Sequence, residues 1–263
     1  MTFKGFAVQY PVYEVITPQT KKSFTLKSLN VQEEEKLKGS LVTPTKIAEH
    51  LNSCLFNSIV SKPPDITDLD SFIRNTTLKD RDALLYGLYH ITYEEIRNYQ
   101  VKCTACANNY SVTVQASSTF NFNSYPGENI LTDSHKVELP VSKGVFVTIK
   151  QPTLFDEVYG ITQLSNRPGT TIELITETLI ISKFEQDVPE KKNPIIYSDR
   201  VDVIDAYLSL PAKDKRTIYR TYEKEFGAYG IELKMQSNCT SCGNQDKYDI
   251  DLVESFFRSL FSA

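Results

Sequence analysis

The chain has 263 residues, of which 40% are hydrophobic and 24% are charged. This composition is that of a folded protein with a sizeable core, and it argues against a disordered or fibrous chain. The 29 Lys and Arg residues stand against 33 Asp and Glu residues, so the net charge of −4 gives no general attraction to nucleic acid. No apolar run approaches the roughly 20 residues that span a bilayer, and no signal peptide is recognisable, which predicts a cytoplasmic protein without a membrane anchor.

Residues 1–43 predict an N-terminal β-hairpin arm, because alternating apolar and polar residues flank the breaker Pro18-Gln19-Thr20. A helical segment is expected over residues 44–92. Its first helix begins at Pro44 with Thr43 as N-cap, and a second helix has Thr77 as its cap.

Residues 93–150 predict a first knuckle and further β-strands, with a long polar loop over residues 117–136. Residues 151–230 are expected to be helical, including one helix over residues 170–185. Residues 231–263 predict a second knuckle and a short C-terminal helix that docks on this chain or on a partner. Helices and strands follow no regular βαβ order, so the predicted class is α+β, with these five segments joined as one zinc-linked unit.

One phrase, Cys-Thr-small-Cys-small-Asn, occurs at residues 103–108 and again at residues 239–244. Two cysteines on the turn of a hairpin can direct both sulfurs to one point, and two such turns supply the four thiolates that Zn²⁺ binds tetrahedrally. The sequence therefore predicts two zinc knuckles that share one structural Zn²⁺ per chain. The predicted ligands are Cys103, Cys106, Cys239 and Cys242.

The long separation of the two phrases makes the predicted ion a clamp between distant parts of the chain. Closing such a loop costs about 4 kcal/mol, whereas a structural zinc site contributes roughly 10–16 kcal/mol of binding free energy. Metal binding can therefore drive the closure.

Three other uses of these cysteines stay open: disulfide bonds, a thioredoxin-like redox pair, and two separate zinc sites completed by other residues. A reducing cytoplasm disfavours the first two. Two separate zinc sites would need further ligands, and the only histidines are His50, His90 and His135. None of them lies at ligand spacing from a cysteine pair.

The remaining candidate residues predict no catalytic role. Cys54 lies on an apolar helix face and is expected to be a small buried residue. His135 is expected to be a polar loop residue, and Asp202 and Asp205 to lie on the solvated face of a helix. Because the sequence also contains no Gly-rich phosphate loop, His-Glu-x-x-His or Gly-x-Ser-x-Gly motif, it predicts a protein that is not an enzyme.

The order of these motifs resembles that of the T-even-type (myovirus) phage baseplate hub and hub-assembly family. The resemblance covers most of the chain. It includes the opening stretch 10–37, the segment 65–114 with the first Cys-x-x-Cys, and the end 239–257 with Cys-x-x-Cys-Gly and Phe-Phe. It implies a structural or assembly role in the hub of a contractile-tail baseplate, in the host cytoplasm during assembly and then in the virion tail.

The resemblance and the predicted metal site together favour a zinc-stabilised, non-enzymatic structural subunit of the baseplate hub. A transient hub-assembly chaperone that is absent from the mature virion is the alternative. A zinc-ribbon nucleic-acid-binding protein is a third hypothesis, which the net charge disfavours. The expected partners are other hub and wedge proteins, with self-association as a further option, and neither nucleic acid nor a membrane.

Overall fold

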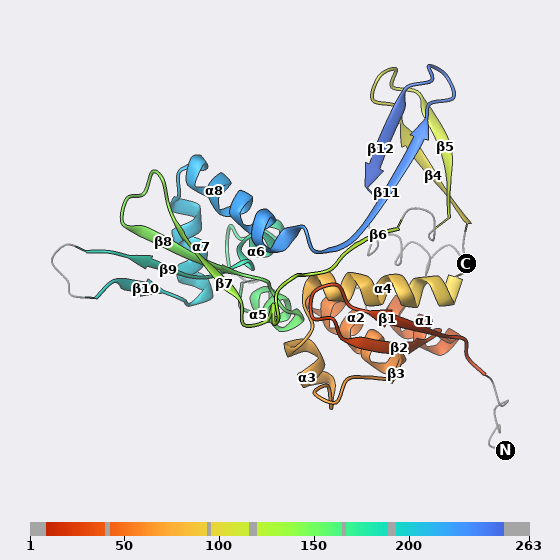
Figure 1. Cartoon of the computed structure of the whole chain (residues 1–263), viewed down its shortest axis with the longest axis horizontal. Helices are drawn as coiled ribbons and strands as arrows, with labels where there is room; N and C mark the ends of the chain where they lie inside the picture. Colours follow the sequence, from red (N-terminus) through yellow and green to blue (C-terminus); the bar gives the residue numbers. More distant parts are fainter. Residues whose placement is uncertain are drawn as a thin grey trace.

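The computed structural model describes residues 9–39, 43–93, 96–115, 120–164, 167–188 and 193–249. Helices and strands are mixed within it, and the four cysteines of the repeated phrase gather at one place, which confirms the predicted α+β class. Figure 1 shows two lobes side by side and a pair of hairpins that projects from the first lobe. No helix in the described ranges is long and apolar enough to cross a membrane.

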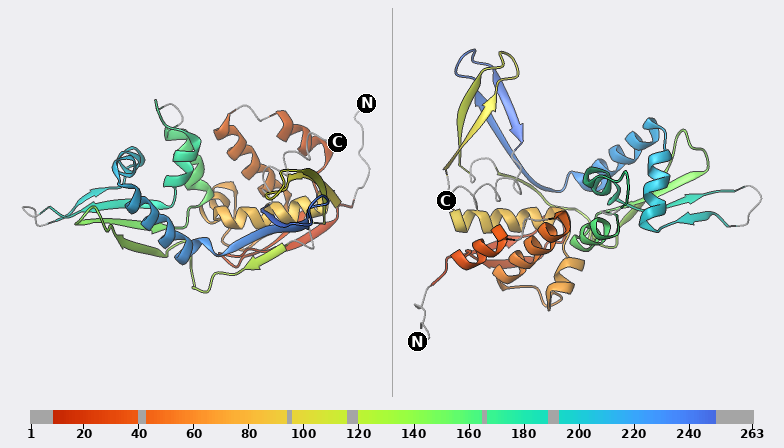
Figure 2. Two further views of the ribbon diagram at one scale, coloured as in Figure 1. Left: turned by 90° about the horizontal axis from the view of Figure 1, so that it is seen from above. Right: turned by 180° about the vertical axis from the view of Figure 1, so that it is seen from behind.

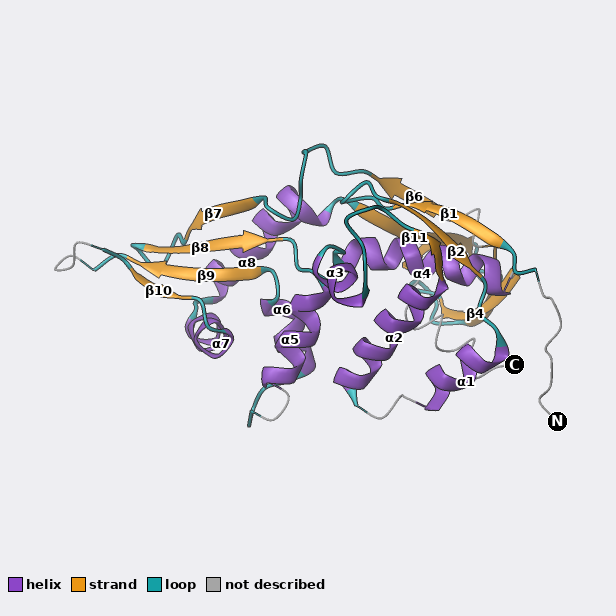
Figure 3. Cartoon of the chain, turned by 90° about the horizontal axis from the view of Figure 1, so that it is seen from below, coloured by secondary structure: helices purple, strands orange, loops and turns teal. Residues whose placement is uncertain are grey.

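In the described residues, the first lobe contains a three-stranded antiparallel sheet and four helices. In the sheet, β1 (Val12–Ile16) pairs with β2 (Ser23–Lys27), which confirms the N-terminal hairpin, and β2 pairs with β3 (Ile59–Ser61). Figure 3 shows helices on one side of this sheet. The helices are α1 (Val31–Gly39), α2 (Pro44–Ser58), α3 (Leu69–Arg74) and α4 (Leu78–Tyr93).

Local sequence explains how two of these helices form and pack. The hydroxyl of Thr43 accepts a hydrogen bond from the backbone N–H of Lys46, which caps α2 as predicted. Helix α4 packs so closely on β1 that a Cβ atom at Gly87 would lie 2.4 Å from a methyl group of Val15. Glycine is required there because the helix and the strand leave no room for a side chain.

The second lobe contains a four-stranded antiparallel sheet in the order β10-β9-β8-β7. Its strands are β7 (Ser134–Glu138), β8 (Val145–Lys150), β9 (Ile181–Gln186) and β10 (Ile195–Tyr197). Its helices are α5 (Leu154–Leu164), α6 (Ile172–Thr178), α7 (Arg200–Ser209) and α8 (Ala212–Tyr222), which continues as a π-helical turn over Glu223–Gly227.

Several predicted elements differ in the structure. The helix expected over 170–185 is wrong in its second half, because helix α6 ends at Thr178 and the following apolar residues pair with β8 as strand β9. The loop expected over 117–136 contains β6 (Phe120–Asn123), which pairs with the distant strand β11 (Gly230–Asn238). His135 lies in β7 rather than in a loop. Helix α1 was not predicted within the N-terminal arm, and the predicted C-terminal helix lies outside the described residues.

The two halves of the chain repeat one order of elements. In the first half, the hairpin β1–β2 and the third strand β3 precede helix α4, and a cysteine hairpin follows that helix. In the second half, the hairpin β7–β8 and the third strand β9 precede helix α8, and the other cysteine hairpin follows. In the sequence, the repeat is visible only in the two cysteine phrases. The shared order of elements is not visible there, because the two sheets differ in nearly every side chain.

A buried aspartate joins helix and hairpin in the first repeat. Asp80 is the third residue of α4 and has no exposed surface. Its carboxylate accepts backbone N–H groups of Gln19 at 2.8 Å and Thr20 at 3.1 Å, and the hydroxyl of Thr20 at 2.6 Å. These donors belong to the turn between β1 and β2, so the carboxylate fixes the turn on the helix.

The second repeat has the same contact. Asp214 is the third residue of α8 and is also fully buried. It accepts the backbone N–H groups of Val141 at 2.9 Å and Ser142 at 3.0 Å, and the hydroxyl of Ser142 at 2.7 Å, from the turn between β7 and β8. The two repeats therefore share a helix–turn contact as well as an order of elements.

Each lobe has its own apolar core, and a smaller cluster joins them. The core of the first lobe is built from buried residues between Val15 and Tyr89, together with Leu154. The core of the second lobe is built from buried residues between Ile130 and Phe226. Between them, Ala48 of α2 packs with residues of α5, α6 and α7. Arg81 of α4 also forms a two-point ion pair with Glu157 of α5.

Substitution of Asp80 tests the helix–turn contact. Asp80→Asn should lower the free energy of unfolding by about 2 kcal/mol, because an amide nitrogen would face a backbone donor and leave it unpaired. Asp214→Asn should destabilise the chain in the same direction. Asp202→Asn, at an exposed carboxylate of α7, is the control and should change stability by less than about 0.5 kcal/mol. Equal urea-unfolding curves for all three variants would contradict this role of the buried carboxylates.

Candidate metal centre

Each cysteine phrase is the turn of an antiparallel hairpin. The first turn joins β4 (Ile96–Lys102) to β5 (Asn109–Gln115), and the second joins β11 to β12 (Gln245–Asp249). The two hairpins lie side by side and stand away from the second lobe (Figures 1 and 2). At its base, β11 also pairs with β6 and packs against α4, which anchors the projecting pair on the body.

The two turns have the same backbone geometry. The N–H of Cys103 donates to the carbonyl of Asn108 at 2.9 Å, and the N–H of Cys239 donates to that of Asn244 at 2.8 Å. Ala107 and Gly243 occupy equivalent places with φ of 58° and 72°. A small residue suits this left-handed position, which explains why the phrase has alanine or glycine there.

The four sulfur atoms converge on one point between the turns. They all lie within 4.8 Å of one another. The Sγ atoms of Cys103 and Cys242 are 3.6 Å apart, and those of Cys106 and Cys239 are 3.7 Å apart. Four thiolates about 2.3 Å from a tetrahedral Zn²⁺ ion would be separated by about 3.8 Å, whereas a disulfide bond is about 2.05 Å long. The arrangement therefore fits a metal ion, with both short separations joining one hairpin to the other.

Backbone N–H groups favour the ionised form of one sulfur. The N–H groups of Cys242 and then Ser241 donate to the thiol of Cys239, which lowers the pKa of Cys239 to about 7. A thiolate is the form that binds a metal, so these N–H groups favour coordination at Cys239, whereas at Cys242 the N–H group of Asn244 is outweighed by the neighbouring sulfurs, which raise the pKa of that thiol.

A carboxylate beside the sulfurs joins the two turns. Asp246 of β12 accepts the backbone N–H of Thr104 at 3.2 Å and also its hydroxyl. Asn244 donates to the same carboxylate at 2.9 Å, and the Tyr248 hydroxyl donates to it at 3.2 Å. The Thr104 hydroxyl is the main cause of the lowered pKa of Asp246. Asp246 therefore joins the first turn to the second beside the sulfurs.

A tyrosine makes the matching contact from the other hairpin. The buried Tyr110 hydroxyl lies 2.8 Å from the Ser237 hydroxyl and 3.2 Å from the Tyr248 hydroxyl. Tyr110 and Asp246 each lie seven residues after the first cysteine of their phrase, so the repeat places them at equivalent positions. Sequence reasoning missed both residues, although this shared offset was a signal that could have found them.

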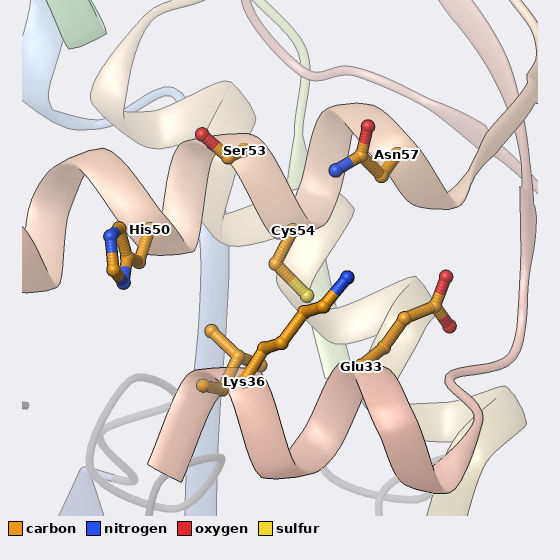
Figure 4. Close-up of a pocket in the computed structure, with 7 residues that line it drawn as sticks. Glu33, Lys36, His50, Ser53, Cys54 and Asn57 are labelled. Atoms are coloured by element: carbon orange, nitrogen blue, oxygen red, sulfur yellow. The ribbon is translucent and has the colours of Figure 1, made fainter. Parts of the chain in front are cut away.

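The other cysteine lies far from this centre. Cys54 of α2 lines a hollow of about 550 Å³ between α1 and α2, with Glu33, Lys36 and His50 among its neighbours (Figure 4). Burial, and then the charge of Glu33, raises the pKa of Cys54 to about 12. The thiol therefore stays neutral, and Cys54 packs against the core as expected but is only partly buried, because it also lines this hollow.

The remaining candidates are not brought together. In the described ranges, the four cysteines are the one group of three or more metal-binding side chains that could hold an ion, so no histidine joins them. His90 contacts the rings of Tyr13 and Tyr86 in the first lobe. Asp202 and Asp205 lie on the exposed side of α7, and Asp205 pairs with Arg167.

Comparison with known proteins shows the family of the chain. A family model described as T4 bacteriophage base plate protein matches residues 10–258, which include both cysteine hairpins. The chain belongs to this family. Neither the curated proteins nor the solved structures gave a match to the chain.

The metal content of the purified protein tests the four-sulfur site. Protein prepared without added metal should contain about one zinc ion per chain by elemental analysis, because the four sulfurs fit a single tetrahedral ion. Cys242→Ser should lose most of the metal, whereas Cys54→Ser is the matched control and should keep it. A wild-type ratio near zero, with free or oxidised thiols, would show that the sulfurs hold no ion.

The metal should leave as the pH falls. Coordination requires deprotonated sulfurs, so protons compete with the ion, and lowering the pH from about 8 to about 5 should release it. Zinc release can be followed with a coloured chelator, and loss of structure in the hairpins with near-ultraviolet circular dichroism of their tyrosines. Release that is independent of pH would contradict coordination by four thiolates.

Proposed function

We propose that this base plate protein is a structural subunit of the hub, which one Zn²⁺ ion stabilises and which acts through contacts with other hub and wedge proteins. Family membership over residues 10–258 is the observation that carries the proposal. In this role the chain would assemble in the host cytoplasm and remain in the tail baseplate of the virion, without binding nucleic acid or a membrane.

Zinc is proposed as the ion because of its ligands. Four cysteine sulfurs are the donor set of structural zinc sites, and the two short sulfur–sulfur separations are close to the tetrahedral value. Cys103, Cys106, Cys239 and Cys242 would hold it. Four protein thiolates leave no position for water or substrate, so the ion would stabilise the fold without taking part in a reaction, and the protein would not be an enzyme.

The proposed ion would act on assembly through shape. The cysteine hairpins follow α4 in one repeat and α8 in the other, so joining the hairpins fixes parts of the chain that are distant in sequence. A rigid projecting pair can present its exposed turn residues, including Thr240 and Ser241, to a neighbouring subunit at little entropic cost.

Mass spectrometry of purified phage particles tests the proposed location. A structural subunit should be present in finished particles at a fixed copy number. If the protein is required for infectious particles but is absent from them, it is the transient assembly chaperone instead. If it is neither present nor required, both proposals are wrong.

Substitution of a single cysteine tests the link between the metal and assembly. Cys106→Ser or Cys242→Ser should lower the unfolding temperature and reduce incorporation into the baseplate together, because both effects follow from loss of the joined hairpins. Cys54→Ser should leave incorporation unchanged. A Cys242→Ser protein that lacks zinc but assembles into infectious particles at normal yield would show that the metal is dispensable.

A further inference from the structure

Helices α4 and α8 occupy the same place in the two repeats, but their surroundings differ. Strand β11 crosses one side of α4 so closely that a Cβ atom at Gly230 would lie 3.1 Å from the Lys79 side chain. On the same side of α4, Tyr86 is only 6% exposed. This side of the first helix is therefore covered by the fold.

The equivalent side of α8 is open and basic. Counted from the buried aspartate of each helix, Lys79, Asp82 and Tyr86 of α4 correspond to residues 213, 216 and 220 of α8. The latter are Lys213, Arg216 and Arg220, and all three are exposed. A spacing of three and four residues places them on one face of the helix.

The two arginines border a hollow. It has a volume of about 450 Å³ and is also lined by Tyr207, Tyr219 and Lys215. The ammonium group of Lys215 lies 4.3 Å from the centre of the Tyr207 ring and 4.0 Å from the carboxylate of Glu177. The hollow is also lined by Glu177 itself, so it combines aromatic surface, one carboxylate paired with Lys215, and positive charge from the two arginines at its edge.

Nearby acids do not neutralise Arg216 and Arg220. Asp214 points to the opposite side, into the turn between β7 and β8. Glu177 accepts the Tyr207 hydroxyl at 2.9 Å, and the carboxylate of Glu223 lies over Gly227. Within the described ranges, neither arginine side chain forms an ion pair or a hydrogen bond, whereas a simply solvated helix face usually mixes both signs of charge.

From these observations we infer that Lys213, Arg216 and Arg220, together with the hollow beside them, form a docking surface for an acidic segment of a partner protein. Guanidinium groups bind carboxylates through two parallel hydrogen bonds, and the tyrosine rings can cover an apolar residue next to the acid. That the partner is a base plate protein rests on the proposed function.

The charge distribution favours a protein over nucleic acid as the occupant. The three cations lie within eight residues, or about 10 Å of helix, and would contact few phosphates. A chain with net charge −4 repels a long polyanion, whereas a short acidic segment meets only this local patch.

A binding measurement on the full-length, metal-loaded chain tests the surface directly. The probe is a fluorescent peptide of alternating glutamate and alanine, followed by anisotropy at low salt. Arg216→Glu with Arg220→Glu should weaken binding at least about tenfold, because two attractive contacts become repulsive. Lys36→Glu with Lys46→Glu makes the same change of net charge at exposed lysines of the first lobe and should alter binding by less than about twofold.

Three results would overturn the inference: no binding by the wild-type chain, equal loss in both double variants, or tighter binding of a single-stranded oligonucleotide that the arginine substitutions abolish. Incorporation into particles separates this inference from the proposed function. If wild-type chain is present in particles and the arginine variant is incorporated equally well, the docking surface is wrong and the structural role stands. If wild-type chain is absent from particles, the structural role fails, while the peptide measurement still decides whether the surface binds acids.

Discussion

The convergence of four sulfurs between two hairpins is the constraint on which the projecting part of the molecule depends. A two-stranded ribbon alone is marginally stable in water. Each short sulfur–sulfur separation joins the first hairpin to the second, so neither hairpin can complete the site by itself. The two lobes do not depend on the sulfur site in this way, because each has its own apolar core. Apolar packing therefore accounts for the lobes, and the sulfur site accounts for the relation of the hairpins.

In each lobe, a buried aspartate joins two elements, as the sulfurs join the two hairpins. Asp80 and Asp214 each connect a helix to a hairpin turn. Each carboxylate accepts hydrogen bonds from two backbone N–H groups and a hydroxyl of a hairpin turn, so these donors are satisfied where the helix packs on the turn. Burial raises the pKa of Asp80, since charge is costly there, and the three donors partly offset that cost. Removing one partner of this contact costs more free energy than the intact contact contributes, because the remaining groups lose their hydrogen bonds. Loss of either aspartate is therefore costly, which is a reason for the same arrangement to recur in both repeats.

What the sequence predicted depended on the distance over which each interaction acts. The two cysteine hairpins were predictable because each pair of cysteines and its small turn residue lie within six positions. The N-terminal hairpin and the cap of α2 are equally local and are confirmed. Strand β6 was missed because its partner β11 lies more than a hundred residues away, and β9 was assigned to a helix because its apolar run has no clear period. Asp246 was missed for the first reason, since its contacts to Thr104 cross between the hairpins.

The repeat also explains where the molecule is symmetric and where it is not. At the sulfurs the two halves correspond closely, with separations of 3.6 and 3.7 Å and matching turns. The correspondence extends to the order of elements and to the helix–turn contacts of Asp80 and Asp214, but it fails beside the helices: β11 covers one side of α4, and no described strand covers the same side of α8. A covered helix face can be apolar or neutral, as Tyr86 is, but an open face must be hydrated, and Arg220 stands in the equivalent place. Polar side chains on this side of α8 are therefore expected, because no described strand covers it as β11 covers α4. The cations lie beside a hollow, which gives the open face a positively charged surface that the covered face of α4 lacks.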